Sequence, residues 1–132
     1  MKQNLFNVIA LLATSTLVGI NNPANATPSN YQKSCNNISV FGNVLSANCS
    51  RTNGSFNKTS IVLRGIENIN GTFKVTDPGK VSNYQFTCQN IRIRGNDLKA
   101  ACKSRNGTLK WTSTVLQGIE NINGVLKYSS SP

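Results

Sequence analysis

The chain has 132 residues, of which 38% are hydrophobic and 14% charged, and its 14 Lys and Arg against 4 Asp and Glu give a formal net charge of +10. Histidine is absent, so the usual zinc ligand and general base are missing, and four carboxylates barely suffice for one hard-cation cage. Metal-dependent chemistry is close to excluded, and neither a metal nor a cofactor is expected. The low charged fraction also argues against long salt-bridged helices.

The first 26 residues have the features of a secretory signal peptide. Lys2 gives a positive start, an apolar stretch covers residues 5–20, and Ala24-Asn25-Ala26 supplies small residues for cleavage. The alternative is a membrane anchor, but the stretch is short for one, and no later segment is apolar for long enough to span a bilayer. We expect cleavage after residue 26, a mature chain of residues 27–132 with a net charge of +9, and a secreted or periplasmic location.

The cysteines form an even set, and in an oxidising compartment such a set favours disulfides over metal or redox sites. Four cysteines allow three pairings. Cys35 and Cys49 enclose thirteen residues, as do Cys88 and Cys102, so two equivalent local loops are the simplest pairing. Each such loop would stabilise the fold by roughly 3 kcal/mol.

An internal repeat organises the chain. When the sequence is shifted by 53 positions, residues 31–75 align with residues 84–128 without a gap, and 24 of the 45 aligned positions are identical. Two copies are too few for a solenoid, so we expect two pseudo-symmetric halves. Repeat one is placed at residues 29–75, the linker at residues 76–81 and repeat two at residues 82–128.

Within each repeat the hydrophobic pattern has the period of β-strands, which predicts an all-β fold. In chain order, repeat one begins with a hairpin around Gly42-Asn43 and continues with a strand over residues 59–63. Residues 65–68 allow one helical turn, and a second hairpin follows around Asn70-Gly71. Repeat two has the same elements, with turns at Gly95-Asn96 and Asn123-Gly124 and its third strand over residues 112–116.

The order of motifs in each repeat carries a resemblance. Both copies contain Cys, Gly-x-x-Leu, Cys, Asn-Gly, Val-Leu and Ile-Glu-Asn-Ile-Asn-Gly in this order. This doubled pattern, which covers nearly all of residues 27–132, closely resembles the cyanovirin-N homology family of lectins. The resemblance implies two pseudo-symmetric halves, each joining a three-stranded sheet from one repeat to a β-hairpin exchanged from the other. It also implies two carbohydrate pockets for α-linked mannose, typically the Manα(1→2)Man ends of high-mannose glycans on oligosaccharides or glycoproteins.

The resemblance also indicates which residues would line the pockets. The first would use Asn30, Lys33, Ser34, Ser50, Arg51, Thr52, Asn53, Asn121, Ile122, Asn123 and Gly124. The second, by pseudo-symmetry, would use Asn83, Phe86, Thr87, Lys103, Ser104, Arg105, Asn106, Glu67, Asn68, Asn70 and Gly71. Sugar hydroxyls both donate and accept hydrogen bonds, so fixed amides, hydroxyls and backbone groups suit them. The second pocket is favoured because it keeps Glu67 and Arg105.

The basic charge supports a rival function, a secreted protein that binds polyanions such as an acidic polysaccharide or an anionic surface. Nucleic acid is not expected as the partner, because the chain has few aromatic residues, no stacking motif and an export signal. Trp111 is interpreted as a core or sheet-face residue. The basic side chains gather in repeat two, at Arg92, Arg94, Lys99, Lys103, Arg105 and Lys110.

Catalysis ranks last among the functions considered. Glu67 and Glu120 are repeat mates, so equivalent surroundings would give them similar proton affinities, whereas a glycosidase pair needs different ones. No enzyme activity is therefore expected. The protein is predicted to be a monomer, or a homodimer that exchanges halves about the linker at residues 76–80.

Overall fold

The computed structural model describes residues 27–129. This part of the chain contains ten β-strands and two short 3₁₀ helices. The predicted signal peptide lies outside it. Residues 28–129 form one unit, and the all-β prediction is confirmed. The elements of repeat one are η3 (Tyr31–Lys33), β1 (Cys35–Phe41), β2 (Val44–Ser50), β3 (Phe56–Val62), β4 (Ile66–Ile69) and β5 (Thr72–Val75). Those of repeat two are η4 (Tyr84–Phe86), β6 (Cys88–Arg94), β7 (Asp97–Lys103), β8 (Leu109–Val115), β9 (Ile119–Ile122) and β10 (Val125–Tyr128).

Each repeat contributes an antiparallel three-stranded sheet, in the order β1-β2-β3 or β6-β7-β8. The turn predicted at Gly42-Asn43 joins β1 to β2. Cys35 lies opposite Cys49 on these strands, Cys88 lies opposite Cys102 on β6 and β7, and each pair forms a disulfide. The prediction of two local loops is therefore confirmed.

Each repeat ends in a two-stranded hairpin, β4-β5 or β9-β10, with an Asn-Gly turn at its tip. Asn70 has a φ of 54°, the positive value that such turns require. The helical turn predicted over residues 65–68 is wrong. Gly65 has a φ of 77°, and β4 begins at Ile66, which pairs with Val75. Short asparagine-rich segments have no strong helix preference, so pairing with β5 decides the conformation.

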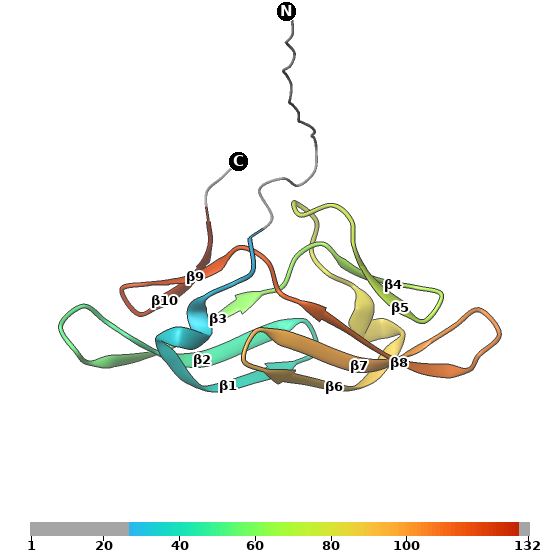
Figure 1. The fold of residues 1–132 in the computed structure, drawn as a ribbon, viewed down its shortest axis with the longest axis horizontal. Coiled ribbons are helices and arrows are strands. Elements are labelled where there is room, and N and C mark those ends of the chain that lie inside the picture. Colours follow the sequence, from blue (N-terminus) through green and yellow to red (C-terminus); the bar gives the residue numbers. More distant parts are fainter. Residues whose placement is uncertain (1–26, 130–132) are drawn as a thin grey trace, which may run out of the picture. The chain divides into compact units, whose positions relative to one another are not determined.

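The terminal hairpin of each repeat packs on the sheet of the other repeat (Figure 1). The N–H of Leu126 in β10 donates to the Thr59 hydroxyl in β3 at 3.1 Å, and the N–H of Phe73 in β5 donates to the Thr112 hydroxyl in β8 at 2.9 Å. Strands β1 and β6 contact each other where the two sheets meet. As a result, buried side chains from both repeats form one hydrophobic cluster.

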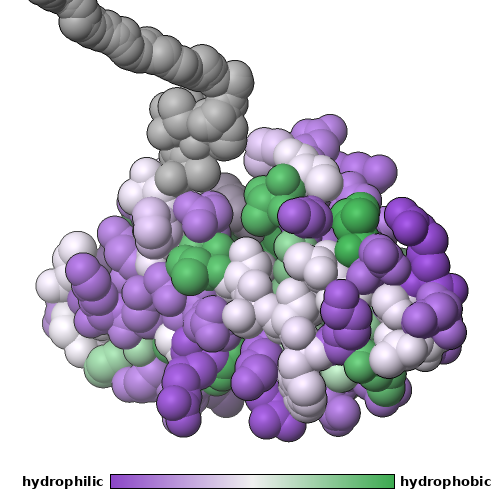
Figure 2. Space-filling model, turned by 45° about the vertical axis from the view of Figure 1, so that its right-hand side comes forward, coloured by the Kyte–Doolittle hydropathy of each residue, from purple (hydrophilic) through white to green (hydrophobic). Residues whose placement is uncertain are grey.

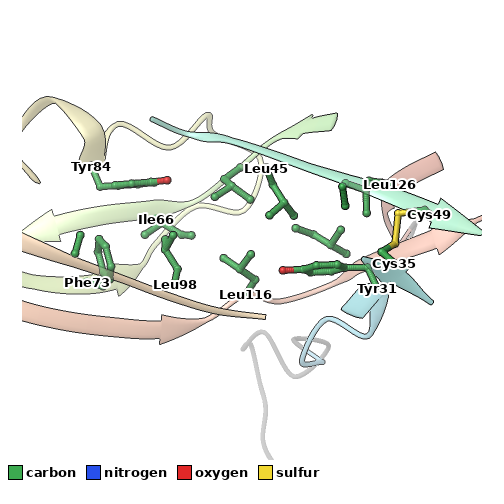
Figure 3. Packing of buried hydrophobic residues seen from close by; sticks show 14 of the residues in the cluster. Tyr31, Cys35, Leu45, Cys49, Ile66, Phe73, Tyr84, Leu98, Leu116 and Leu126 are labelled. Atoms are coloured by element: carbon green, nitrogen blue, oxygen red, sulfur yellow. A yellow bond between two sulfur atoms is a disulfide. The ribbon is translucent and has the colours of Figure 1, made fainter. Parts of the chain in front are cut away.

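Tyr31 and Tyr84 occupy equivalent positions in this cluster, and both are fully buried. Figure 3 shows their hydroxyl groups pointing toward the middle of the cluster from opposite ends. The Tyr31 hydroxyl donates to the Gly95 carbonyl in repeat two, and the Tyr84 hydroxyl donates to the Gly42 carbonyl in repeat one. Burial raises the pKa of both phenols well above the ordinary value. Each tyrosine thus fastens its own repeat to a turn of the other.

Candidate functional site

Most of the residues that the resemblance implies come together in two places, one in each half. We call first site the region where the tip of the β9-β10 hairpin meets the loop at residues 50–53, and second site the region where the tip of the β4-β5 hairpin meets the loop at residues 103–106. In both sites a loop that follows a disulfide-bonded strand is fixed to a hairpin of the other repeat.

Asn121 fixes the first site from the hairpin side. Its Nδ2 donates to the Ser34 hydroxyl at 2.9 Å and to the Ser50 carbonyl at 3.0 Å, while its Oδ1 accepts from the N–H of Gly124 at 2.7 Å. One amide therefore holds the segment before the first cysteine, the loop after the second cysteine and the hairpin turn in a fixed arrangement.

A second set of hydrogen bonds completes the first site. The Oδ1 of Asn123 accepts from the Thr52 N–H at 2.9 Å and from its hydroxyl at 3.2 Å. The Nδ2 of Asn57 donates to the Gly124 carbonyl at 2.7 Å, and its Oδ1 accepts from the Arg51 guanidinium at 2.8 Å. The Arg51 guanidinium is thus hydrogen-bonded to another residue of the site, Asn57.

The second site has the same arrangement of asparagine hydrogen bonds between loop and hairpin, which we call the frame of each site. Asn68, the repeat mate of Asn121, donates from Nδ2 to the Thr87 hydroxyl and to the Lys103 carbonyl, both at 3.0 Å, and accepts from the Gly71 N–H at 2.7 Å. The Oδ1 of Asn70 accepts from the Arg105 N–H at 2.8 Å. Four asparagines that the resemblance implies as sugar contacts therefore hold the sites together, and Asn68 and Asn121 use both of their amide donors for this.

The side chains around the two frames differ. Arg105 stands where the first site has Thr52, so the second site presents a guanidinium in place of a hydroxyl bonded to the hairpin. Arg105 and Lys103 are both exposed. Phe86, in the place of Lys33, has an 80% exposed ring. Each site thus has two basic residues, Lys33 and Arg51 in the first and Lys103 and Arg105 in the second. The sites differ in that Arg51 is hydrogen-bonded to Asn57, whereas the second site has an exposed aromatic ring.

Two implied residues lie apart from these frames. Successive side chains of a strand point to opposite faces, so Glu67 and Ile122 face away from their neighbours Asn68 and Asn121, which contact the loops. The carboxylate of Glu67 accepts a hydrogen bond from the Thr76 hydroxyl instead. The charged acceptor expected in the second site is thus directed to the other side of its hairpin.

Sequence reasoning missed several residues that fix the hairpins. Asn57 bonds the hairpin turn, and the hydroxyls of Thr59 and Thr112 accept from the hairpin strands. The two threonines are identical in both repeats, within stretches predicted as strands. That identity could have indicated a shared structural role, whereas Asn57 is replaced by Lys110 in repeat two and gives no such signal.

The described surface is mostly polar. Figure 2 shows hydrophilic side chains over most of the visible face, with separate hydrophobic groups between them. A hollow on the sheet of repeat one is lined by residues outside both sites, namely Asn37, Ser46, Ala47, Asn48, Lys58, Thr59 and Ser60. Within residues 27–129 there is no group of three acidic or cysteine side chains that could hold a metal ion. None of the helices in this part of the chain is long and apolar enough to cross a membrane.

Comparison with known proteins agrees with this architecture. Microvirin in its complex with mannobiose is 28% identical, with a TM-score of 0.61, and the match covers 76% of this chain and 99% of microvirin. A MoCVNH3 variant in complex with (N-GlcNAc)4 is 22% identical, with a TM-score of 0.64 and coverage of 76% and 97%. The CVNH protein of T. borchii is 24% identical, with a TM-score of 0.64 and coverage of 75% and 98%. The model of the CVNH domain family matches residues 31–127, and the chain therefore belongs to this family.

Proposed function

We propose that this protein is a carbohydrate-binding lectin that recognises α-linked mannose termini of high-mannose glycans through one site in each half. The observation that carries the proposal is the pair of equivalent frames, in which asparagine amides fix loop and hairpin backbones side by side. The 28% identity to microvirin, which was solved with mannobiose, supports mannose as the sugar.

The geometry suits a neutral, multiply hydroxylated ligand. A pyranose offers several groups that both donate and accept, so it binds best where partners are already held in place. In both sites the disulfide, the hairpin and the asparagine amides fix the loop backbone before any ligand arrives. The amides act as positioning groups, and the loop backbone and exposed side chains are left to contact sugar.

Arg105 is the side chain that we assign to the sugar in the second site. It is exposed, and its backbone N–H is anchored by Asn70. Arg51, by contrast, is bonded to Asn57 and faces its own loop. A guanidinium that donates to sugar hydroxyls forms charge-assisted hydrogen bonds, which are stronger than neutral ones. The second site should therefore bind the terminal mannose more tightly than the first.

Titration of ¹⁵N-labelled protein with Manα(1→2)Man tests the proposal. The amide signals of residues 51–53 and 104–106 should move, and the effect should persist at high salt because the ligand is uncharged. Arg105→Thr, which installs the residue of the first site, should weaken the second site about tenfold, the effect of losing roughly 1.5 kcal/mol of charged hydrogen bonding. Arg92→Ser, the control on a sheet face, should leave both affinities unchanged.

Two outcomes would contradict the proposal. If neither loop responded to mannobiose or to longer mannose glycans, the protein would not be a mannose lectin. If an N-acetylglucosamine tetramer moved the same signals at lower concentration than mannobiose did, lectin activity would stand but the mannose assignment would be wrong.

A further inference from the structure

A cationic aromatic cluster lies on the face of the β6-β7-β8 sheet opposite to the one that contacts the β4-β5 hairpin through Thr112. Trp111 is 54% exposed there. The Arg92 Cζ and the Lys99 Nζ each lie 5.3 Å from the centre of its ring. We call Arg92, Lys99 and Trp111 the outer cluster.

The register of the sheet brings these three side chains together. Arg92 on β6 lies directly opposite Lys99 on β7, and Trp111 on β8 lies opposite Ala101. Ala101 is buried, and its small side chain leaves room for the indole. Like charges placed directly opposite one another are destabilising, and the ring offsets this only partly. A bound anion would relieve the repulsion.

The nearby acidic residue does not neutralise the cluster. Asp97 lies opposite Arg94, which is two residues after Arg92 and on the same face of β6. The four acidic residues of the chain are Glu67, Asp77, Asp97 and Glu120, and the structure shows no ion pair from any of them to the cluster within residues 27–129. Arg92 and Lys99 therefore present uncompensated charge beside an exposed aromatic ring.

The other repeat shows that the fold does not require the cluster. Ser39 and Ser46 occupy the places of Arg92 and Lys99 in the first sheet, and Lys58 occupies the place of Trp111. Where repeat two carries the indole, repeat one has a polar hollow lined in part by Ser46 and Lys58. Because an equivalent sheet folds with these small and polar residues, packing alone does not account for the tryptophan and its two cations.

We propose that the outer cluster binds an acidic polysaccharide. Arg92 and Lys99 would bind sulfate or carboxylate groups, and the indole would pack against the apolar C–H face of the adjoining sugar ring. The charge of +10 on the full sequence would favour accumulation on such a chain. Single-stranded nucleic acid is the weaker alternative, because it requires a series of stacking side chains, and the outer cluster offers one.

The protein carries its own reporter for this site, because Trp111 is its only tryptophan. Dextran sulfate should change the tryptophan fluorescence, with an affinity that falls strongly between about 50 and about 200 mM salt. Polygalacturonate tests carboxylate in place of sulfate, and neutral dextran should have no effect. Mannobiose should leave the fluorescence unchanged, since its sites lie elsewhere, so failure of this proposal and failure of the mannose proposal are distinguishable.

Substitutions by the residues of repeat one provide matched variants. R92S/K99S should weaken dextran sulfate binding tenfold or more and flatten its salt dependence, while K80S/K127S, which removes two cations elsewhere, should weaken it less than threefold. W111K adds a cation, so simple charge attraction predicts tighter binding, whereas our proposal predicts weaker binding, measured by calorimetry. Unchanged circular dichroism spectra and thermal unfolding would show that the variants are folded.

Three results would overturn the proposal. Equal losses from R92S/K99S and K80S/K127S would indicate attraction to net charge alone. Tighter binding by W111K would exclude a role for the indole. Single-stranded DNA that changed the fluorescence at lower concentration than either acidic polysaccharide would assign the cluster to nucleic acid instead.

Discussion

Tyr31 and Tyr84 show how single residues join the two repeats, because each donates its hydroxyl to a turn carbonyl of the other repeat. The third tyrosine, Tyr128, also crosses between repeats and accepts from the Arg64 N–H at 2.8 Å. Burial raises the pKa of all three phenols, although the Arg64 contact partly opposes this at Tyr128. Ionisation of Tyr31 or Tyr84, which are fully buried, would place a phenolate in the protein interior.

These raised pKa values predict unfolding in alkali. Above the ordinary tyrosine value of 10.0, the unfolded chain loses phenol protons that the folded chain keeps, so the folded state binds more protons and stability falls as pH rises. The fall should be about 1.4 kcal/mol per pH unit for each of Tyr31 and Tyr84, and is absent below that pH. Tyrosinate absorbance and circular dichroism, followed together, should change in one transition. A reversible phenol titration near pH 10 in a folded protein would contradict this.

At the scale of elements, the hairpin tips depend on glycine for two separable reasons. A Cβ on Gly124 would lie 2.8 Å from the Arg51 Cγ and 3.1 Å from the Asn57 Cβ, and the same atom on Gly71 would lie 2.8 Å from the Lys110 Cδ. Gly54, in a loop, also has a φ of 89°, but nothing lies within 4 Å of its added Cβ. A substitution at Gly54 therefore measures the cost of a positive φ without a steric clash.

We predict a graded loss of stability in denaturant titrations. Gly54→Ala should cost about 1–2 kcal/mol from positive φ alone. Gly124→Ala should cost a further 1–3 kcal/mol, roughly, because Arg51 and Asn57 are bonded to each other and cannot yield freely. Gly71→Ala should fall between them, since the flexible end of Lys110 can move. In mannobiose titrations Gly124→Ala should weaken the first site alone. Equal costs at all three glycines would show that the close contacts do not matter.

Spacing and turn chemistry predict the local features of the fold, whereas the packing of each hairpin on the sheet of the other repeat is implied only by the family resemblance. The disulfide loops and the Asn-Gly turns depend on neighbouring residues, so spacing and turn chemistry indicate them. The strand over Ile66–Ile69 forms because β5 pairs with it, and no local pattern showed this. Likewise, the resemblance implies that asparagines line the sites, but only the fold shows that the amides of Asn68 and Asn121 bond to the loops and that Glu67 faces away.

Across the whole described unit, the buried residues of the two repeats match each other, whereas several exposed residues differ. The core tyrosines, both disulfides and the four frame asparagines have exact counterparts in the other repeat. Trp111 and Arg105, in contrast, replace Lys58 and Thr52. Because the interior is shared by both repeats, it constrains each of them, whereas the exposed faces can differ and take different ligands.

The linker between the two repeats is a closed loop. It is tied back to repeat one: the Thr76 N–H donates to the Gly65 carbonyl, and the Gly65 N–H donates to the Lys80 carbonyl, both at 2.7 Å. Arg64 also donates to the Gly79 carbonyl at 3.0 Å. The loop at residues 76–80 therefore folds back on itself and is not an open hinge. This closed loop favours the monomer over exchange of halves between chains.

Deletion of residues 77–79 should consequently produce a domain-swapped dimer. The shortened linker cannot form its turn, while the hairpins still need the sheets of a second repeat, so two chains can satisfy these contacts only by exchanging halves. Light scattering after size-exclusion chromatography should show the unaltered protein as a monomer at all concentrations and the deletion variant as a dimer with four sugar sites. Replacement of residues 77–79 by three serines, which keeps the length, should remain monomeric. A monomeric deletion variant with native stability would show that the loop does not control the exchange.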